Sequence, residues 1–203
     1  MSINVEYNNK EINSILMENI LKMLERRGLI KSWSDSFKKI SADVATKTIF
    51  EIELKDKTNY GIYLVNAKLT SIVQGTPLDE YLSNHIDVHK IIIAREVAKK
   101  VVKQIVGEYS NAEFFFENEM LEDIPAKVFI PEHRLINKEE RDELLGKFTE
   151  IELARILVTD MMSRYYAAKI GDIFRIVRPS FTAGKNVFYR RVVHGTWDIL
   201  FES

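Results

Sequence analysis

The run Ile91-Ile92-Ile93 constrains the fold of this chain more than any other feature of its sequence. Three consecutive β-branched residues are typical of a strand that is buried on both faces. Such a strand has to be covered on each side by other elements, which helices do in an α/β layer. The run therefore predicts a layered α/β domain in the first part of the chain.

The segments around this run supply the other elements of that layer. Apolar residues recur at every third or fourth position in 9–27 and again in 98–109, which predicts two helices. Gly28 follows the first helix as a left-handed stop. Two extended runs, 48–54 and 60–65, are joined by a polar connection and predict a hairpin. The order of elements predicts a mixed sheet covered by helices.

The character of the chain changes near Pro125, and we expect two domains, 1–125 and 126–203. In the second, Asn137 and Glu140 form a capping-box pattern that predicts a helix reaching Phe148. Short strands and turns follow. The predicted fold class is α+β, with an N-terminal α/β domain and a small C-terminal α+β domain.

Composition excludes several classes of protein. The chain is 46% hydrophobic and 29% charged, which suits a folded protein and is too apolar for a disordered one. It has no cysteine for disulfides or thiolate zinc sites, and its 4 histidines lack an obvious metal-ligand spacing. No apolar run approaches the ~20 residues needed to cross a bilayer, and no targeting signal is recognisable. We therefore expect no metal, no membrane partner and no secretion.

The charge is unevenly distributed along the chain. The formal net charge is -1, which argues against a protein that coats nucleic acid. Between Arg155 and Arg191, however, eight basic side chains face only two acidic ones, Asp160 and Asp172. This surplus either meets phosphates or an acidic partner, or is a solvated face.

A series of motifs in 129–193 resembles a known family. In chain order they are Phe129-Ile130-Pro131-Glu132-His133, Glu143-Leu144-Leu145, Leu153-Ala154-Arg155-Ile156, Arg164-Tyr165-Tyr166-Ala167, Lys169-Ile170-Gly171-Asp172, Arg178-Pro179-Ser180-Phe181-Thr182-Ala183-Gly184-Lys185 and Tyr189-Arg190. Their order and spacing resemble the C-terminal assembly domain of the fifth-largest subunit of eukaryotic nuclear RNA polymerases, a domain that the archaeal member of the family shares.

The chain also departs from the family pattern. Ala154 and Met161 stand where the family has prolines, and Phe181 replaces an acidic residue. Residues 1–125 match only in outline, as expected of a divergent lineage such as a large DNA virus with its own polymerase. The family usually ends just past Tyr189-Arg190, whereas this chain continues to Ser203. That apolar tail either binds a partner or packs on its own domain.

The resemblance implies a non-catalytic subunit of a DNA-dependent RNA polymerase, acting in transcription. Such a subunit docks on the largest subunit and forms part of the lower jaw near downstream duplex DNA, which it would meet through phosphates. The resemblance also implies that the N-terminal domain is similar to an inactive restriction-nuclease-like fold. It implies neither a cofactor nor a small-molecule substrate. A eukaryotic cellular member would be nuclear, and a virus-encoded one cytoplasmic or virion-associated.

The resemblance also assigns residues to these contacts. Arginine suits docking because its planar fork binds carboxylates and carbonyls with defined geometry. The expected interface with the largest subunit comprises Pro131, His133, Arg155, Arg164, Tyr165, Arg178, Pro179, Ser180, Thr182, Gly184, Tyr189 and Arg190. Candidates near DNA are Lys38, Lys39, Lys99, Lys100 and Lys103, for each of which a solvated face is the alternative.

Two hypotheses from other classes remain. Glu53-Leu54-Lys55 has the spacing of a divalent-metal-dependent nuclease, in which Glu53 binds the metal and Lys55 steadies the attacking water. Asp35 or Asp43 would have to supply the second carboxylate. A free-standing nucleic-acid-binding protein is the other hypothesis, but the charge and the lack of aromatic stacking motifs argue against it.

Overall fold

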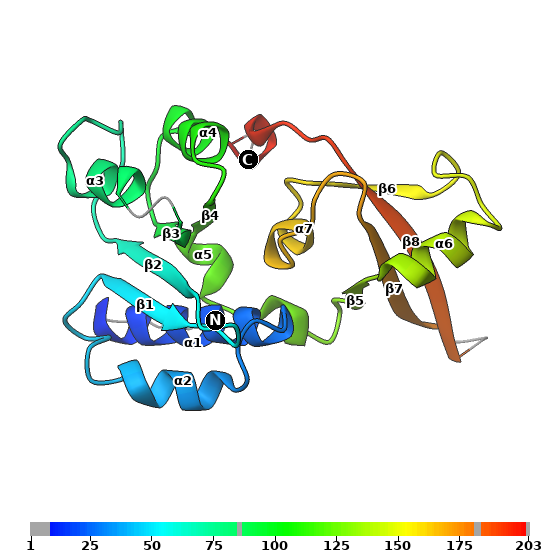
Figure 1. Ribbon diagram of the computed structural model, residues 1–203, viewed down its shortest axis with the longest axis horizontal. Coiled ribbons are helices and arrows are strands. Elements are labelled where there is room, and N and C mark those ends of the chain that lie inside the picture. Colours follow the sequence, from blue (N-terminus) through cyan, green and yellow to red (C-terminus); the bar gives the residue numbers. More distant parts are fainter. Residues whose placement is uncertain (1–8, 85–86, 181–183, 202–203) are drawn as a thin grey trace, which may run out of the picture. The chain divides into compact units, whose positions relative to one another are not determined.

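The structure is a computed structural model that describes residues 9–84, 87–180 and 184–201 (Figure 1). The chain forms two compact units, one ending at Asp123 and the other beginning at Ile124. Each unit contains a four-stranded sheet and several helices, so the predicted α+β class is confirmed. Among the helices in these ranges, none is long and apolar enough to cross a membrane.

The N-terminal unit is a mixed sheet with helices on both sides. Its helices are α1 (Asn9–Arg26), α2 (Trp33–Ile40), α3 (Pro77–Ser83), α4 (Lys99–Glu108) and α5 (Glu117–Met120), and its strands are β1 (Ile49–Glu53), β2 (Asn59–Val65), β3 (His89–Ala94) and β4 (Ala112–Phe116). The strand order is β1-β2-β3-β4, with β1 antiparallel to β2 and the other neighbours parallel. In Figure 1, α1 and α2 lie on one side of this sheet, and α3 and α4 on the other.

The isoleucine run behaves as its composition predicts. Ile91, Ile92 and Ile93 are 0%, 0% and 1% exposed in β3, the strand between β2 and β4. Consecutive residues of a strand point to opposite faces, so equal burial of all three requires cover on both faces. Helix α2 was not predicted, because its apolar residues are few and Ser32 is its only clear start signal.

The C-terminal unit is built on a second mixed sheet. Its elements are η1 (Ile124–Ala126), β5 (Glu132–Leu135), α6 (Lys138–Leu145), β6 (Ala154–Leu157), α7 (Met161–Tyr165), β7 (Ile173–Ser180), β8 (Gly184–Val193) and η2 (Trp197–Phe201). The order is β5-β7-β8-β6, in which only β6 and β8 are parallel. Asn137 and Glu140 form the predicted capping box, but the helix ends at Leu145 rather than Phe148, with Gly146 as its C-cap.

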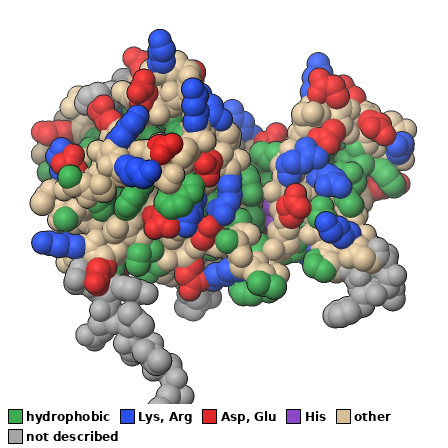
Figure 2. Space-filling view, turned by 90° about the horizontal axis from the view of Figure 1, so that it is seen from below, with side chains coloured by type: hydrophobic (Ala, Val, Ile, Leu, Met, Phe, Trp, Pro, Cys, Tyr) green, Lys and Arg blue, Asp and Glu red, His purple; other side chains and the backbone are tan. Residues whose placement is uncertain are grey.

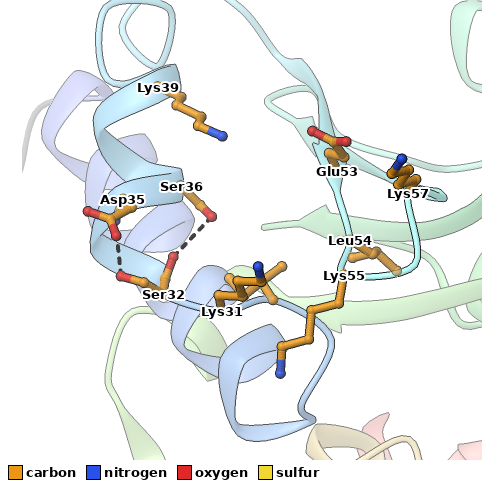
Figure 3. Close-up of a pocket in the computed structure, with 10 residues that line it drawn as sticks. Lys31, Ser32, Asp35, Ser36, Lys39, Glu53, Leu54, Lys55 and Lys57 are labelled. Atoms are coloured by element: carbon orange, nitrogen blue, oxygen red, sulfur yellow. Dashed lines mark hydrogen bonds between the residues drawn. The ribbon is translucent and has the colours of Figure 1, made fainter.

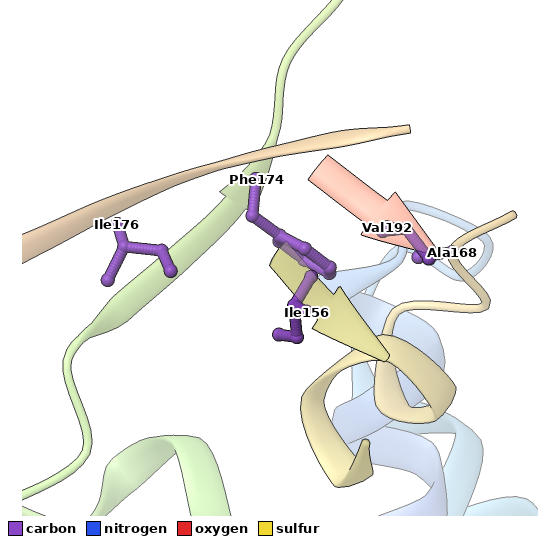
Figure 4. Packing of buried hydrophobic residues seen from close by; sticks show 5 residues of the cluster. All are labelled: Ile156, Ala168, Phe174, Ile176 and Val192. Carbon is purple, nitrogen blue, oxygen red and sulfur yellow. The ribbon is translucent and has the colours of Figure 1, made fainter. Parts of the chain in front are cut away.

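Apolar side chains cover both faces of this second sheet near its centre. One face carries a cluster formed by Ile156, Ala168, Phe174, Ile176 and Val192 (Figure 4). The other face carries a smaller cluster of Leu144, Leu153 and Ile173 beneath α6. Both clusters lie where β7 and β8 have neighbouring strands, so the far end of the β7–β8 hairpin projects beyond the core.

The C-terminal tail packs on its own unit. A Cβ atom placed on Gly195 would lie 2.7 Å from Thr159 Oγ1 and 3.1 Å from Leu157 Cβ, so the backbone approaches closely at this point. The Arg164 guanidinium lies 5.9 Å from the centre of the Trp197 ring. The sequence left open whether the tail binds a partner or packs on its own domain, and the described part of the tail packs on its own domain.

Candidate functional site

The outer half of the β7–β8 hairpin carries several of the residues expected to contact a partner. Arg178, Pro179 and Ser180 pair with Asn186, Lys185 and Gly184 in an antiparallel register. Neither neighbouring strand reaches this far, because β5 pairs with β7 only up to Val177 and β6 pairs with β8 only from Arg190. At the hairpin end, therefore, neither edge is paired with a neighbouring strand.

Exposed apolar side chains lie among the cations of this hairpin end. Arg178 is exposed, and its guanidinium lies 5.4 Å from the centre of the Phe188 ring. Val187 and Phe188 remain 42% and 45% exposed. Sequence reasoning missed these two, because only the pairing of the neighbouring strands shows that this part of β8 extends beyond them. Strands β7 and β8 carry five cationic residues and no acidic one.

A shallow groove runs beside β7 at the hairpin end. Its volume is about 250 Å³, and its lining is mostly apolar: Val128, Ile130, Pro131, Glu132, Val177, Pro179, Gly184 and Lys185. His133 lies next to it, half-buried, with Nδ1–H donating to the Pro131 carbonyl at 2.7 Å. Burial lowers the pKa of His133, which favours the neutral ring and a structural role for this residue.

The other predicted interface residues lie in different places. Arg155 is exposed in β6, while Tyr189 and Arg190 are half-buried in β8. Thr182 lies outside the described residues, and of Ser180 only the backbone is described. The hairpin therefore brings together Arg178, Pro179 and Gly184, with Pro131 at the adjoining groove.

Arg164 and Tyr165 belong to the interior of the C-terminal unit. They are 8% and 3% exposed in α7. Arg164 Nε donates to the Thr159 carbonyl at 3.1 Å, and its guanidinium faces Trp197. Both side chains are thus almost wholly covered in the isolated unit. A direct contact of either one with the largest subunit stays a prediction.

Part of the local basic surplus is neutralised within the unit. Arg191 and Arg141 both bind Glu150, at 2.9 Å and 2.7 Å, and together they hold its pKa below the usual range. Arg134 binds Glu140 through two hydrogen bonds of 2.7 Å. The strands that carry Arg178 and Lys185 contain no carboxylate, so the hairpin end keeps a positive surface.

The residues of the nuclease hypothesis line one pocket but do not converge. This pocket, about 380 Å³, lies between α2 and the end of β1 (Figure 3). Glu53 and Lys55 point in opposite directions in Figure 3, and Lys55 Nζ donates to the Gly28 carbonyl at 2.7 Å. Asp35 also lines the pocket, whereas Asp43 does not.

Charge in this pocket disfavours a divalent cation. Four lysines line it against two carboxylates: Lys31, Lys39, Lys55 and Lys57 against Asp35 and Glu53. In the part of the chain that the structure describes, no three His, Asp or Glu side chains group as metal ligands. The geometry expected of a metal-dependent nuclease is therefore missing here.

The five candidate DNA-contacting lysines fall on two separate surfaces. All five are exposed: Lys38 and Lys39 on α2, and Lys99, Lys100 and Lys103 on α4. These helices lie on opposite sides of the sheet (Figure 1). On the face shown in Figure 2, Lys and Arg side chains alternate with Asp and Glu rather than forming one continuous basic area.

A polar cluster that the sequence did not reveal joins β3 and β4 to Arg27, the residue after α1. Arg27 binds Glu113 through two hydrogen bonds of 2.8 Å and 2.6 Å, and His89 Nε2 lies 2.6 Å from the same carboxylate. The Tyr60 ring stacks on His89 at 4.5 Å. Burial alone would raise the pKa of Glu113, but the Arg27 charge and the His89 hydrogen bond lower it to about 2.

Comparison with known proteins identifies the family. The family model described as RNA polymerase Rpb5, C-terminal domain, matches residues 122–192. DNA-directed RNA polymerase subunit Rpo5 of Archaeoglobus fulgidus is 44% identical over 69 residues, which cover 32% of this chain and 90% of that protein. The chain belongs to the RNA polymerase subunit 5 family.

Similarity to members of this subunit 5 family extends over both units. DNA-directed RNA polymerase subunit 5 of Acanthamoeba polyphaga mimivirus is 28% identical over 194 residues, covering 91% of this chain and 94% of that protein. The subunit rpabc1 of RNA polymerases I, II and III from Dictyostelium discoideum is 28% identical over 196 residues, covering 91% and 100%. The chain is thus a non-catalytic RNA polymerase subunit acting in transcription, and a virus is among the sources of its relatives.

Proposed function

We propose that this subunit docks on the largest polymerase subunit through the outer half of its β7–β8 hairpin. The observation that carries the proposal is the hairpin end, which extends past its neighbouring strands and combines Arg178 and Lys185 with exposed Val187 and Phe188. Apolar groups beside arginine are typical of interface centres, where desolvation strengthens the charged contacts. A complementary surface would be apolar and acidic.

The docking residues we propose come from the family motifs. They are Pro131, His133, Arg155, Arg178, Pro179, Ser180, Thr182, Gly184, Tyr189 and Arg190, among which half-buried His133 would hold the shape of the surface. Arg164 and Tyr165 would support this surface from inside, by holding α7 and the tail in place.

We infer that the N-terminal unit forms part of the lower jaw near downstream DNA, and that it resembles an inactive restriction-nuclease-like fold. Its contacts with DNA would be to phosphates and therefore independent of sequence. Because α2 and α4 lie on opposite sides of the sheet, one duplex would meet either Lys38 and Lys39 or the lysines of α4. The α2 surface is favoured because Lys31 and Lys57 line the adjoining pocket.

Reconstitution of the polymerase tests the docking proposal. The tagged chain is expected to retain the largest subunit in comparable amounts after a high-salt wash. Arg178→Ala combined with Arg190→Ala should lower that retention by about tenfold or more, since the double variant removes two charged groups from the interface. Lys138→Ala, which removes an exposed cation from α6, serves as the matched control. Equal retention of all three proteins would contradict the proposal.

The DNA proposal has a separate test in the assembled polymerase. Lys38→Ala with Lys39→Ala should reduce the salt dependence of DNA binding by about one unit of slope for each phosphate that is no longer neutralised. Lys99→Ala with Lys100→Ala should leave the slope unchanged. The reverse result would put the duplex on the α4 side.

A further inference from the structure

The two edges of the β7–β8 hairpin end differ in their backbone hydrogen-bonding groups. In β8, the Val192 N–H donates to the Asp172 carbonyl, whereas the Val193 carbonyl accepts from Val158 on the β6 side. Successive residues of a strand direct their backbone groups to opposite edges. The β7–β8 register is regular, so the backbone N–H and C=O groups of the odd-numbered residues of β8 point away from β7.

Where β8 extends past β6, this alternation leaves a row of backbone N–H and C=O groups without a strand partner. Pairing with β6 begins at Arg190. Five backbone groups therefore face outward along the β8 edge: the N–H and C=O of Lys185, the N–H and C=O of Val187, and the N–H of Tyr189. Among the backbone hydrogen bonds of residues 184–201, none satisfies these groups.

The β7 edge is blunted by one feature of the sequence. The Ile173 carbonyl accepts from the Ile136 N–H on the β5 side, so the odd-numbered residues of β7 face that edge. Beyond Val177, the next such position is Pro179, which has no N–H to offer.

An open edge on one side only indicates how the hairpin is used. Proteins usually blunt exposed strand edges, because unpaired N–H and C=O groups recruit other strands. Here proline blunts β7, while β8 keeps its donors, its acceptors and two exposed apolar side chains, Val187 and Phe188. The difference favours a β8 edge that receives a strand from a partner.

We propose that the β8 edge at residues 185–189 binds an extended segment of the largest polymerase subunit by strand addition, in line with β6. This inference rests on the proposed docking function and specifies its geometry. The added segment would be about five residues long, given the rise of a strand. Since β7 and β8 carry no acidic residue, the segment would place acidic side chains near Lys185 and Arg190 and apolar ones over Val187 and Phe188.

A proline substitution tests backbone pairing at the β8 edge without removing the charged side chains of the docking surface. Val187→Pro eliminates one outward N–H, and the hairpin already accommodates proline at the outward position 179. Val187→Ala shortens the same side chain but keeps the N–H. Retention of the largest subunit should fall about tenfold or more with Val187→Pro, since one hydrogen bond cannot form and the ring obstructs pairing, and about threefold or less with Val187→Ala. Thermal unfolding checks that both variants are folded.

Amide hydrogen exchange on the unaltered protein gives an independent measurement. In the free chain, the amides of Lys185, Val187 and Tyr189 should exchange rapidly, while those of Asn186 and Phe188, which face β7, should be protected. In the assembled polymerase, the odd-numbered amides should become at least about a hundredfold slower. This result supports strand addition even if Val187→Pro does not fold.

The outcomes separate the two proposals. Failure of the unaltered chain to retain the largest subunit would refute the docking function itself. Full retention of Val187→Pro, with rapid exchange of the odd-numbered amides in the complex, would overturn strand addition and leave docking intact. Self-association of the free chain that Val187→Pro abolishes, with no effect on the polymerase, would assign the edge to a second copy and would also overturn the proposal.

Discussion

Gly61 in β2 is the position where one added methyl group should have the clearest effect. A Cβ atom at Gly61 would lie 2.1 Å from the Tyr81 hydroxyl oxygen and 3.2 Å from its Cζ. Real Cβ atoms essentially never approach a heavy atom within 3.0 Å. The Tyr81 ring on α3 would therefore have to move away from the sheet.

The ring has little room to move. It contacts Tyr63 edge to face at 5.3 Å, and Lys90 Nζ lies 5.7 Å from its centre. Lys90 is itself buried and donates to the Leu82 and Asn84 carbonyls at 2.8 Å. Overpacking of this kind costs about 1–3 kcal/mol, so Gly61→Ala should lower the free energy of unfolding of the N-terminal unit by that amount.

A double-mutant cycle isolates the contact. The Tyr81 hydroxyl is buried and has no hydrogen-bond partner among the described residues. Tyr81→Phe should therefore be nearly neutral by itself, because it breaks no hydrogen bond. It removes the 2.1 Å contact, and the next distance, 3.2 Å, requires a shift of only a few tenths of an ångström. Gly61→Ala should thus cost at least about 1 kcal/mol less when Tyr81→Phe is also present.

Chemical denaturation followed by Trp33 fluorescence measures these differences. Trp33 lies in α2 of the N-terminal unit, and a Trp197→Phe background removes the tryptophan of the other unit. All four proteins of the cycle would carry this substitution. An equal cost of Gly61→Ala with and without Tyr81→Phe, within about 0.3 kcal/mol, would refute the steric argument.

Two further predictions concern other buried contacts. Glu113→Gln should lower the free energy of unfolding by about 3 kcal/mol, because it leaves buried Arg27 without its carboxylate. Since the pKa of Glu113 falls from 4.5 to about 2 on folding, its stabilisation should be lost as pH falls between those values, and an acid titration of Glu113→Gln should show a shallower slope. An unchanged slope would contradict the linkage. Gly195→Ala should destabilise the C-terminal unit by about 1–3 kcal/mol in thermal unfolding, because Thr159 obstructs the methyl group; an unchanged midpoint would mean that the tail moves aside.

Local patterns in the sequence were sufficient for most of the elements and for the family. The Ile91-Ile92-Ile93 run predicted a strand buried on both faces, and Asn137 with Glu140 predicted a helix start that the structure contains. The ordered motifs of 129–193 predicted the family that the comparisons identify. These properties depend on neighbouring residues, whose spacing the chain order specifies directly.

Which side chains remain accessible depended on contacts between distant parts of the chain. Arg164 and Arg178 belong to similar basic motifs. Trp197 and Thr159 cover Arg164, whereas Arg178 lies on a hairpin that extends past its neighbouring strands.

The sequence by itself therefore determined the class of the fold, most of its elements and the polymerase family. Only the tertiary structure decided that the DNA candidates on α2 and α4 lie apart, that Lys55 binds the end of α1, and that one edge of the hairpin is open. The physical reason is that periodicity specifies which face of an element is apolar, whereas strand order and strand length specify what that face and each edge will meet.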